Sequence, residues 1–81
     1  MPPDVVRVEV IRPYVIEVTF DDGSVRRVDL EADLWGEMFE PLKDPAVFAQ
    51  ATVDPELGTV VWPNGADLSP EFLYAAREQP V

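Results

Sequence analysis

Alternation of apolar and polar residues over the first thirty positions is the feature that most limits what this chain can fold into. Three consecutive segments carry apolar side chains at every second position or nearly so: residues 5–11, 14–20 and 24–30. A period of two places these side chains on one face of a β-strand. Pro13 cannot donate to a β-ladder, and Asp22-Gly23 tolerates the positive φ of a tight turn, so both breaks are predicted turns. The pattern predicts a three-stranded antiparallel meander.

The faces of these strands follow from the same period. In the first strand, Val6, Val8 and Val10 are predicted to face the core. In the third strand, Val25 and Val28 fall on opposite faces unless a β-bulge intervenes.

After residue 30 the apolar period changes from that of a strand to that of a helix. Five residues share one side of a helix and predict a short helical or 3-10 segment near residues 34–40: Leu34, Trp35, Met38, Phe39 and Leu42. Pro41 argues against one continuous helix. A second short turn is predicted from Pro45, with Asp44 as its cap and Phe48 pointing inward.

Residues 49–53 and 59–62 predict two more strands, joined by a turn over residues 54–58 that has proline early and glycine late. The sequence shows no linker, repeat or low-complexity tract. We therefore expect one small α+β domain over residues 1–81, with a three-stranded antiparallel meander, a second β-hairpin and short helices packed on one face.

The stretch VVWPNGADLSPEFLY, residues 60–74, predicts the closure of this fold. Structural turn and cap roles are predicted for Asp22, Gly23, Asn64, Gly65, Asp67 and Pro70, with Asp67 or Ser69 as the cap of a terminal helix. Phe72, Leu73 and Ala76 of that helix are expected to lie over the sheet near Trp62. Aromatic residues are also common interface anchors, so a second interpretation makes four of them candidate partner contacts: Trp62, Tyr74, Trp35 and Tyr14.

The composition excludes several classes of chemistry. The chain has no cysteine and no histidine, which removes disulfides, thiol nucleophiles, the commonest general base and the commonest metal ligand. No apolar run approaches the roughly 20 residues that span a bilayer, and the first residues lack the features of a signal peptide. We expect a cytoplasmic protein with no membrane association.

The formal net charge is −10, from 6 basic and 16 acidic residues. Binding of nucleic acid by the chain alone is not expected, because it requires lysine and arginine at the phosphates. A basic protein partner would be attracted.

One acidic stretch, residues 29–40, has part of the spacing of a metal site. Oxygen-bearing side chains fall at positions 1, 3, 5, 9 and 12 of an EF-hand-like pattern that starts at Asp29, but position 6 is Leu34, where the sharp turn requires glycine. Ser24 and Ser69 have no adjacent base in the sequence. We expect no catalytic, metal or cofactor-binding residue; a small-ligand or metal sensor is retained as a third hypothesis.

The sequence resembles the small bacterial family known as domain of unknown function 2442 (DUF2442). The residues that carry the resemblance are Tyr14–Phe20 with Asp22-Gly23, Val28-Asp29-Leu30, Phe39, Leu42, Phe48, the block Val61–Leu68, Pro70 and Leu73-Tyr74. The resemblance implies a compact α+β domain and assigns no catalytic residue. Genes of this family often lie beside another small gene, in the manner of toxin–antitoxin pairs, which implies a protein partner.

The leading functional hypothesis is therefore a non-catalytic protein-interaction module. It would be the acidic, antitoxin-like partner of a basic protein from a neighbouring gene. The alternative is a structural domain that forms a homodimer through an edge strand such as residues 5–11.

Overall fold

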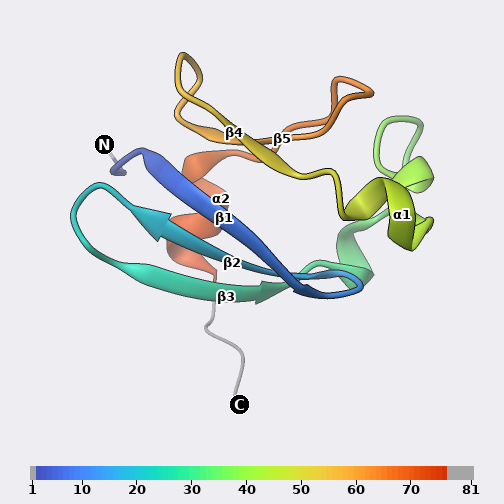
Figure 1. Ribbon diagram of the computed structural model, residues 1–81, viewed down its shortest axis with the longest axis horizontal. Coiled ribbons are helices and arrows are strands. Elements are labelled where there is room, and N and C mark those ends of the chain that lie inside the picture. The colour runs from blue at the N-terminus through green and yellow to red at the C-terminus, as the bar shows by residue number, and fades with distance from the viewer. Residues whose placement is uncertain (1, 77–81) are drawn as a thin grey trace.

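A computed structural model describes residues 2–76 of the chain. Its elements, in chain order, are β1 (Val5–Arg12), β2 (Val15–Phe20), β3 (Val25–Asp29), the 3-10 turns η1 (Glu31–Asp33) and η2 (Glu40–Lys43), α1 (Pro45–Phe48), β4 (Thr52–Asp54), β5 (Thr59–Val61) and α2 (Pro70–Ala75). Strands β1, β2 and β3 form one antiparallel sheet, and β4 with β5 forms a second. In Figure 1 the β4–β5 hairpin lies along one side of the larger sheet, α2 lies behind that sheet, and α1 lies at one end. The predicted α+β architecture is confirmed.

The core face of the larger sheet is set by the alternation in β2. Ile16, Val18 and Phe20 are each no more than 1% exposed, and residues paired across the ladder share their face. Ile16 pairs with Val28 of β3, which is also buried. Val25 is exposed on the opposite face, and the β2–β3 ladder runs without a bulge.

The prediction that Val6 faces the core is wrong. The register of β1 against β2 shifts between Val5 and Arg7, and this bulge places Val5 rather than Val6 on the core face. Val5 is 2% exposed and Val6 is 55% exposed. An added residue in one strand reverses the face of everything on one side of it, so strict alternation cannot extend through the bulge.

The first turn also lies one residue later than predicted. It consists of Pro13 and Tyr14, and Tyr14 has a φ of 72°, so this residue belongs to the turn and not to the second strand. Its hydroxyl donates to the carbonyl of Lys43, and its ring packs edge-on against Phe48 with 5.6 Å between centroids. These contacts hold a non-glycine residue in a left-handed conformation that is costly by itself.

The second hairpin is shorter than predicted. Strand β4 begins at Thr52 rather than residue 49, because the backbone amides of residues 49–51 still donate to carbonyls of α1. The predicted last strand residue, Trp62, lies just outside β5 because its amide donates to Ala66 and closes the next turn at 2.9 Å.

The predicted helical or 3-10 segment near residues 34–40 does not form as one element. Two separate 3-10 turns, η1 and η2, flank an irregular loop in which Gly36 has a φ of 89°. A left-handed residue ends a right-handed helix, so the apolar residues of this region reach the core as single anchors. Leu34 and Leu42 are buried at the two ends of the loop. Asp44 caps α1 as predicted, accepting the amide of Ala46 at 2.9 Å.

At the C-terminal helix α2, Ser69 is the cap and Pro70 the first helical residue. The Ser69 hydroxyl oxygen accepts from the amides of Glu71 and Phe72, at 3.1 and 3.4 Å. Asp67, the other cap considered, instead forms an isolated antiparallel bridge with Val61.

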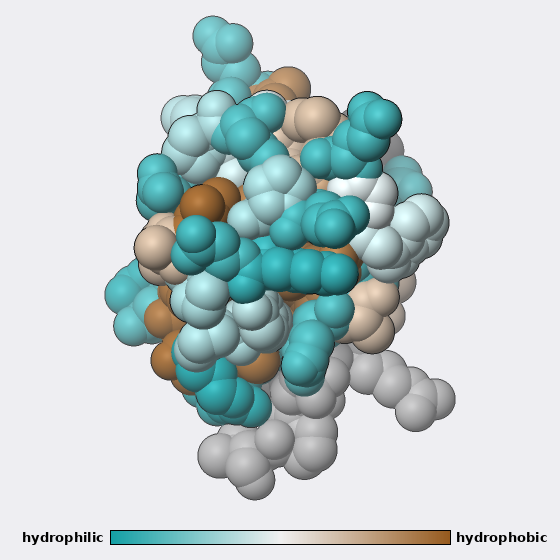
Figure 2. Space-filling view, turned by 90° about the vertical axis from the view of Figure 1, so that its right-hand side faces the viewer, coloured by the Kyte–Doolittle hydropathy of each residue, from teal (hydrophilic) through white to brown (hydrophobic). Residues whose placement is uncertain are grey.

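The core joins both sheets to α2 and the loops. Leu73 is fully buried, and Trp62 is 2% exposed with its indole N–H donating to the carbonyl of Phe48 at 2.9 Å. Figure 2 shows the α1 end of the molecule, where hydrophilic side chains dominate and hydrophobic ones form small separate patches. No helix among residues 2–76 is long and apolar enough to cross a membrane.

Candidate functional site: an aromatic groove

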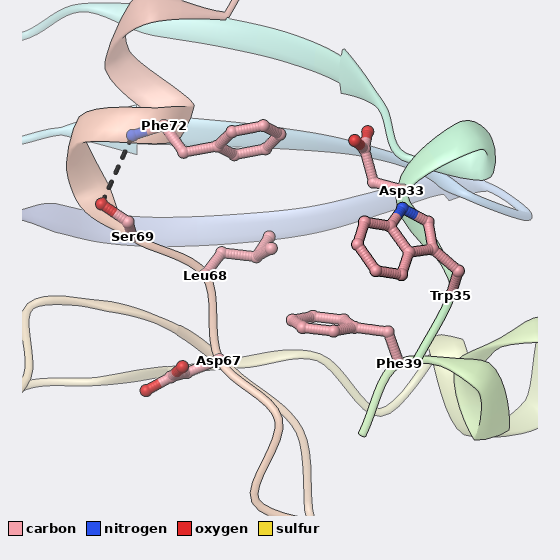
Figure 3. Close-up of a pocket in the computed structure, with 7 residues that line it drawn as sticks. All are labelled: Asp33, Trp35, Phe39, Asp67, Leu68, Ser69 and Phe72. Atoms are coloured by element: carbon pink, nitrogen blue, oxygen red, sulfur yellow. Dashed lines mark hydrogen bonds between the residues drawn. The ribbon is translucent and has the colours of Figure 1, made fainter. Parts of the chain in front are cut away.

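A hollow of about 400 Å³ opens on the surface between the η1–η2 loop, the segment before α2, and α2 itself. We call it the aromatic groove and define it by seven residues: Asp33, Trp35, Phe39, Asp67, Leu68, Ser69 and Phe72. Figure 3 shows the rings of Trp35 and Phe39, from the η1–η2 loop, and of Phe72, from α2, directed toward a common space beside Leu68. The volume is within the range of pockets that hold a small molecule or one large side chain.

Trp35 is the most exposed of these aromatic residues, at 74%. It follows Leu34, which is anchored in the core, and precedes the left-handed Gly36. Its amide donates to the carbonyl of Asp33 at 3.0 Å. Because its neighbour Leu34 is taken into the core and the chain reverses at Gly36, the indole of Trp35 is directed outward.

Asn64 joins two walls of the groove. Its side-chain amide donates to the carbonyl of Met38 at 2.9 Å, and its side-chain oxygen accepts the amide of Ala66 at 3.1 Å. The first bond crosses to the loop that carries Trp35 and Phe39. The second shapes the turn that leads to the segment carrying Leu68. A residue predicted only as part of a turn therefore also positions the loop that forms the opposite wall.

Phe72 forms the third wall. It is 41% exposed, although Leu73 beside it is fully buried. Consecutive residues of an α-helix point about 100° apart, and α2 has only six residues. The prediction that Phe72, Leu73 and Ala76 cover the sheet is therefore only partly right. Leu73 enters the core and Ala76, just after α2, packs partly buried against it, whereas Phe72 lines the groove.

Two carboxylates belong to the groove. In Figure 3 the carboxylate of Asp33 stands between the ring of Phe72 and the indole of Trp35, whereas that of Asp67 points away from the three rings. Both residues are exposed. Among residues 2–76, no ion pair or side-chain hydrogen bond engages the carboxylate of Asp33. The groove thus combines aromatic faces with a negative charge at its edge.

The acidic side chains of the stretch that begins at Asp29 do not converge on a common metal position. Asp29 instead accepts the amide of Glu31 at 2.9 Å and so supports η1. Within the part of the chain that the structure describes, no group of three or more acidic side chains is placed to hold a metal ion.

The four candidate partner contacts occupy different environments. Trp35 lines the aromatic groove, but Trp62 is enclosed in the core and presents no surface to a partner in this conformation. Tyr14 and Tyr74 are partly buried against the core, and their hydroxyls already donate to Lys43 and Asp22. Of these four candidates, only Trp35 is exposed.

Tyr74 belongs to a cluster that holds α2 to the β2–β3 turn. Its hydroxyl donates to Asp22 at 2.9 Å, and its ring meets Phe20 edge-on with 5.0 Å between centroids. The guanidinium of Arg26 lies 5.0 Å from the centre of the Tyr74 ring, and its Nε donates to the Tyr74 carbonyl at 3.3 Å. The backbone amide of Ser24 is the main cause that holds the pKa of Asp22 below its ordinary value, and Tyr74 and Arg26 act in the same direction.

The remaining predicted turn residues take local roles. Asp22 accepts the amide of Ser24 at 2.8 Å, and Gly23 and Gly65 have φ values of 88° and 92°. On the other face of the sheet, Arg27 pairs with Glu17 at 2.9 Å. These contacts give each of these turn and cross-strand residues a structural role that requires no ligand.

Comparison with protein families gives one match. The family model described as "Protein of unknown function (DUF2442)" matches residues 5–79. The chain belongs to this family. All seven residues of the aromatic groove lie inside the matched range. A search of the curated proteins and a search of the solved structures each found no match.

Proposed function

We propose that this DUF2442 chain is a non-catalytic protein-interaction module that binds a basic partner, in the antitoxin-like role implied by the family resemblance. The observation that carries the proposal is the aromatic groove. It exposes Trp35 and Phe72 on a chain whose formal net charge is −10. Large exposed aromatic side chains gathered in one hollow are typical of contact surfaces.

Electrostatics supports a basic partner. A strongly acidic chain attracts positively charged proteins over several ångströms before contact, which raises the association rate. The aromatic side chains then contribute short-range contact, which is insensitive to salt. Such a complex forms quickly and weakens as salt screens the charges.

A binding role is also supported by how the polar groups of the groove are used. The hydroxyl oxygen of Ser69 accepts two amides at the start of α2, so this serine serves the helix. The chain has no histidine to activate a nucleophile and no cysteine to serve as one.

The test is to express the chain together with the product of its neighbouring gene and purify through a tag on one of them. We expect a stable complex at about 0.05 M salt that dissociates substantially at about 1 M, where the Debye length is near 3 Å. Failure of the two proteins to co-purify, with both folded, would refute the proposed partner.

A homodimer is the alternative, and the position of β1 is the observation that favours it. β1 is an edge of the larger sheet. Apart from its bonds to β2, β1 makes one backbone hydrogen bond within residues 2–76: the amide of Val5 donates to the carbonyl of Gly58, in the β4–β5 turn, at 2.8 Å. Edge strands can pair with a second copy, although the bulges in β1 oppose it. Light scattering distinguishes the two, since a monomeric mass eliminates the homodimer.

A further inference from the structure

We infer that the aromatic groove binds the side chain of an arginine carried by the basic partner. This inference rests on the proposed interaction function and specifies what the module recognises. The guanidinium would lie against the exposed rings of Trp35 and Phe72, with Asp33 as its counter-charge.

The lining of the groove fits a cation with an apolar stem. Leu68 is 9% exposed at the base, and three aromatic rings surround the hollow, so the walls favour the methylene groups of a long side chain. The faces of aromatic rings carry partial negative charge and attract a cation held within about 6 Å. Asp33 supplies a full negative charge at the edge of the same space.

Arginine fits this combination better than lysine. Its guanidinium is planar, stacks on aromatic faces, is weakly hydrated and can donate two parallel hydrogen bonds to a carboxylate. Lysine carries a compact, strongly hydrated charge that loses more hydration on entering such a site.

A related combination of groups occurs within the fold. Arg26 lies over the ring of Tyr74 at 5.0 Å, and the hydroxyl of Tyr74 is bonded to the carboxylate of Asp22. There, a guanidinium, an aromatic ring and a carboxylate are all supplied by the chain itself. In the aromatic groove, the described residues supply the aromatic rings and the carboxylate of Asp33. The partner would supply the guanidinium.

The charge of the surface agrees with a cationic occupant. Of the seven residues of the groove, two are acidic and none is basic. A purely apolar segment would bury the carboxylate of Asp33 without compensation, which is costly. A cationic side chain offsets that cost by pairing with it.

The experiment uses three short acetylated and amidated peptides that differ only in the central residue between two leucines: arginine, citrulline or glutamate. Citrulline preserves the shape and most of the hydrogen-bonding groups of arginine but has no charge. Binding to the full chain is followed by nitrogen–proton correlation NMR. The indole N–H of Trp35 is the reporter, and that of the buried Trp62 is an internal control.

We expect the arginine peptide to shift the Trp35 signal and leave that of Trp62 unmoved. It should bind at least about threefold more tightly than the citrulline peptide, as expected for a cation at an exposed aromatic site. Trp35→Ala and Asp33→Asn should each weaken arginine binding by about two- to fivefold. Glu56→Gln is the matched control: it removes the same single charge from the β4–β5 turn, which does not line the groove, and should leave binding unchanged.

Equal binding of the arginine and citrulline peptides would overturn the inference in favour of an apolar segment. Failure of both peptides to bind would also overturn it. So would a molecular mass that doubles in the wild type but not in Trp35→Ala, because the groove would then bind a second copy of the chain. The proposed function is judged separately. If the neighbouring gene product binds Trp35→Ala with the same measured affinity as the wild type, the groove is not the arginine site but the interaction module stands.

Discussion

Leu73 and Phe72 offer a direct test of how burial is divided along α2. Leu73 is fully buried, whereas Phe72 is 41% exposed at the aromatic groove. Replacement of Leu73 by alanine removes buried methyl groups and leaves a cavity, so we expect a loss of about 2–5 kcal/mol in the free energy of unfolding. A chain of 81 residues has roughly 4–12 kcal/mol in total, so this is a large fraction.

Phe72→Ala removes more carbon atoms but should cost less. Full burial of such a side chain contributes about 1.5–3 kcal/mol, and scaling this to the covered part of the Phe72 ring gives about 1–2 kcal/mol. No enclosed cavity forms, since the groove is open to solvent. Alanine has a higher helix propensity than either residue and gains more over phenylalanine than over leucine, which further lowers the expected cost of Phe72→Ala.

Urea unfolding followed by circular dichroism measures both variants. Leu73→Ala should have the lower midpoint with an unchanged slope, and its melting temperature should fall by at least about 8 °C. If Phe72→Ala were as destabilising as Leu73→Ala, or more so, Phe72 would be a core residue. The aromatic groove would then be a poor description of this surface.

Two other substitutions test contacts elsewhere in the fold. Trp62→Phe removes the buried N–H donor to the carbonyl of Phe48, and we expect a loss of about 1–3 kcal/mol in the free energy of unfolding; an unchanged urea midpoint would contradict this. Asp22 allows a test of pH dependence. The hydrogen bonds from Ser24 and Tyr74 lower the pKa of Asp22 in the folded state. Their contribution to stability is therefore present above the pKa of the unfolded state, about 4, and is lost as the pH falls through the pKa of the folded state. Unfolding of Asp22→Asn should therefore vary less with pH below about 4 than that of the wild type, and parallel pH profiles would refute the assignment.

The three strands of the larger sheet could be predicted from the sequence because their signals are local. Alternation in β2 sets its core face, Asp22-Gly23 has the chemistry of a tight turn, and Pro13 cannot continue a ladder. The predictions from sequence are wrong where pairing with a distant segment changes the face that a local pattern predicts. At Val6, a bulge in the pairing with β2 reverses the face that alternation alone predicts.

The region from residue 31 to residue 43 shows the limit most clearly. The helical spacing of its apolar residues reflects two anchors, Leu34 and Leu42, that reach the core from separate turns. Gly36, with its positive φ, prevents the helix that would have unified them. Glycine could have been read as a breaker of this segment, but its φ depends on the loop that is closed by Asn64 and Met38.

By itself, the sequence determined the α+β class, the order of strands in the larger sheet, the acidic surface and the absence of histidine and cysteine chemistry. These properties depend on composition, period and turn residues that lie next to one another in the chain. Tertiary structure alone decided that Trp62 is enclosed while Trp35 and Phe72 stay at the surface. Which side of an aromatic residue is covered depends on segments distant in sequence. The aromatic groove forms where residues 33–39 meet residues 67–72, two segments distant in sequence whose contact cannot be read from either one alone.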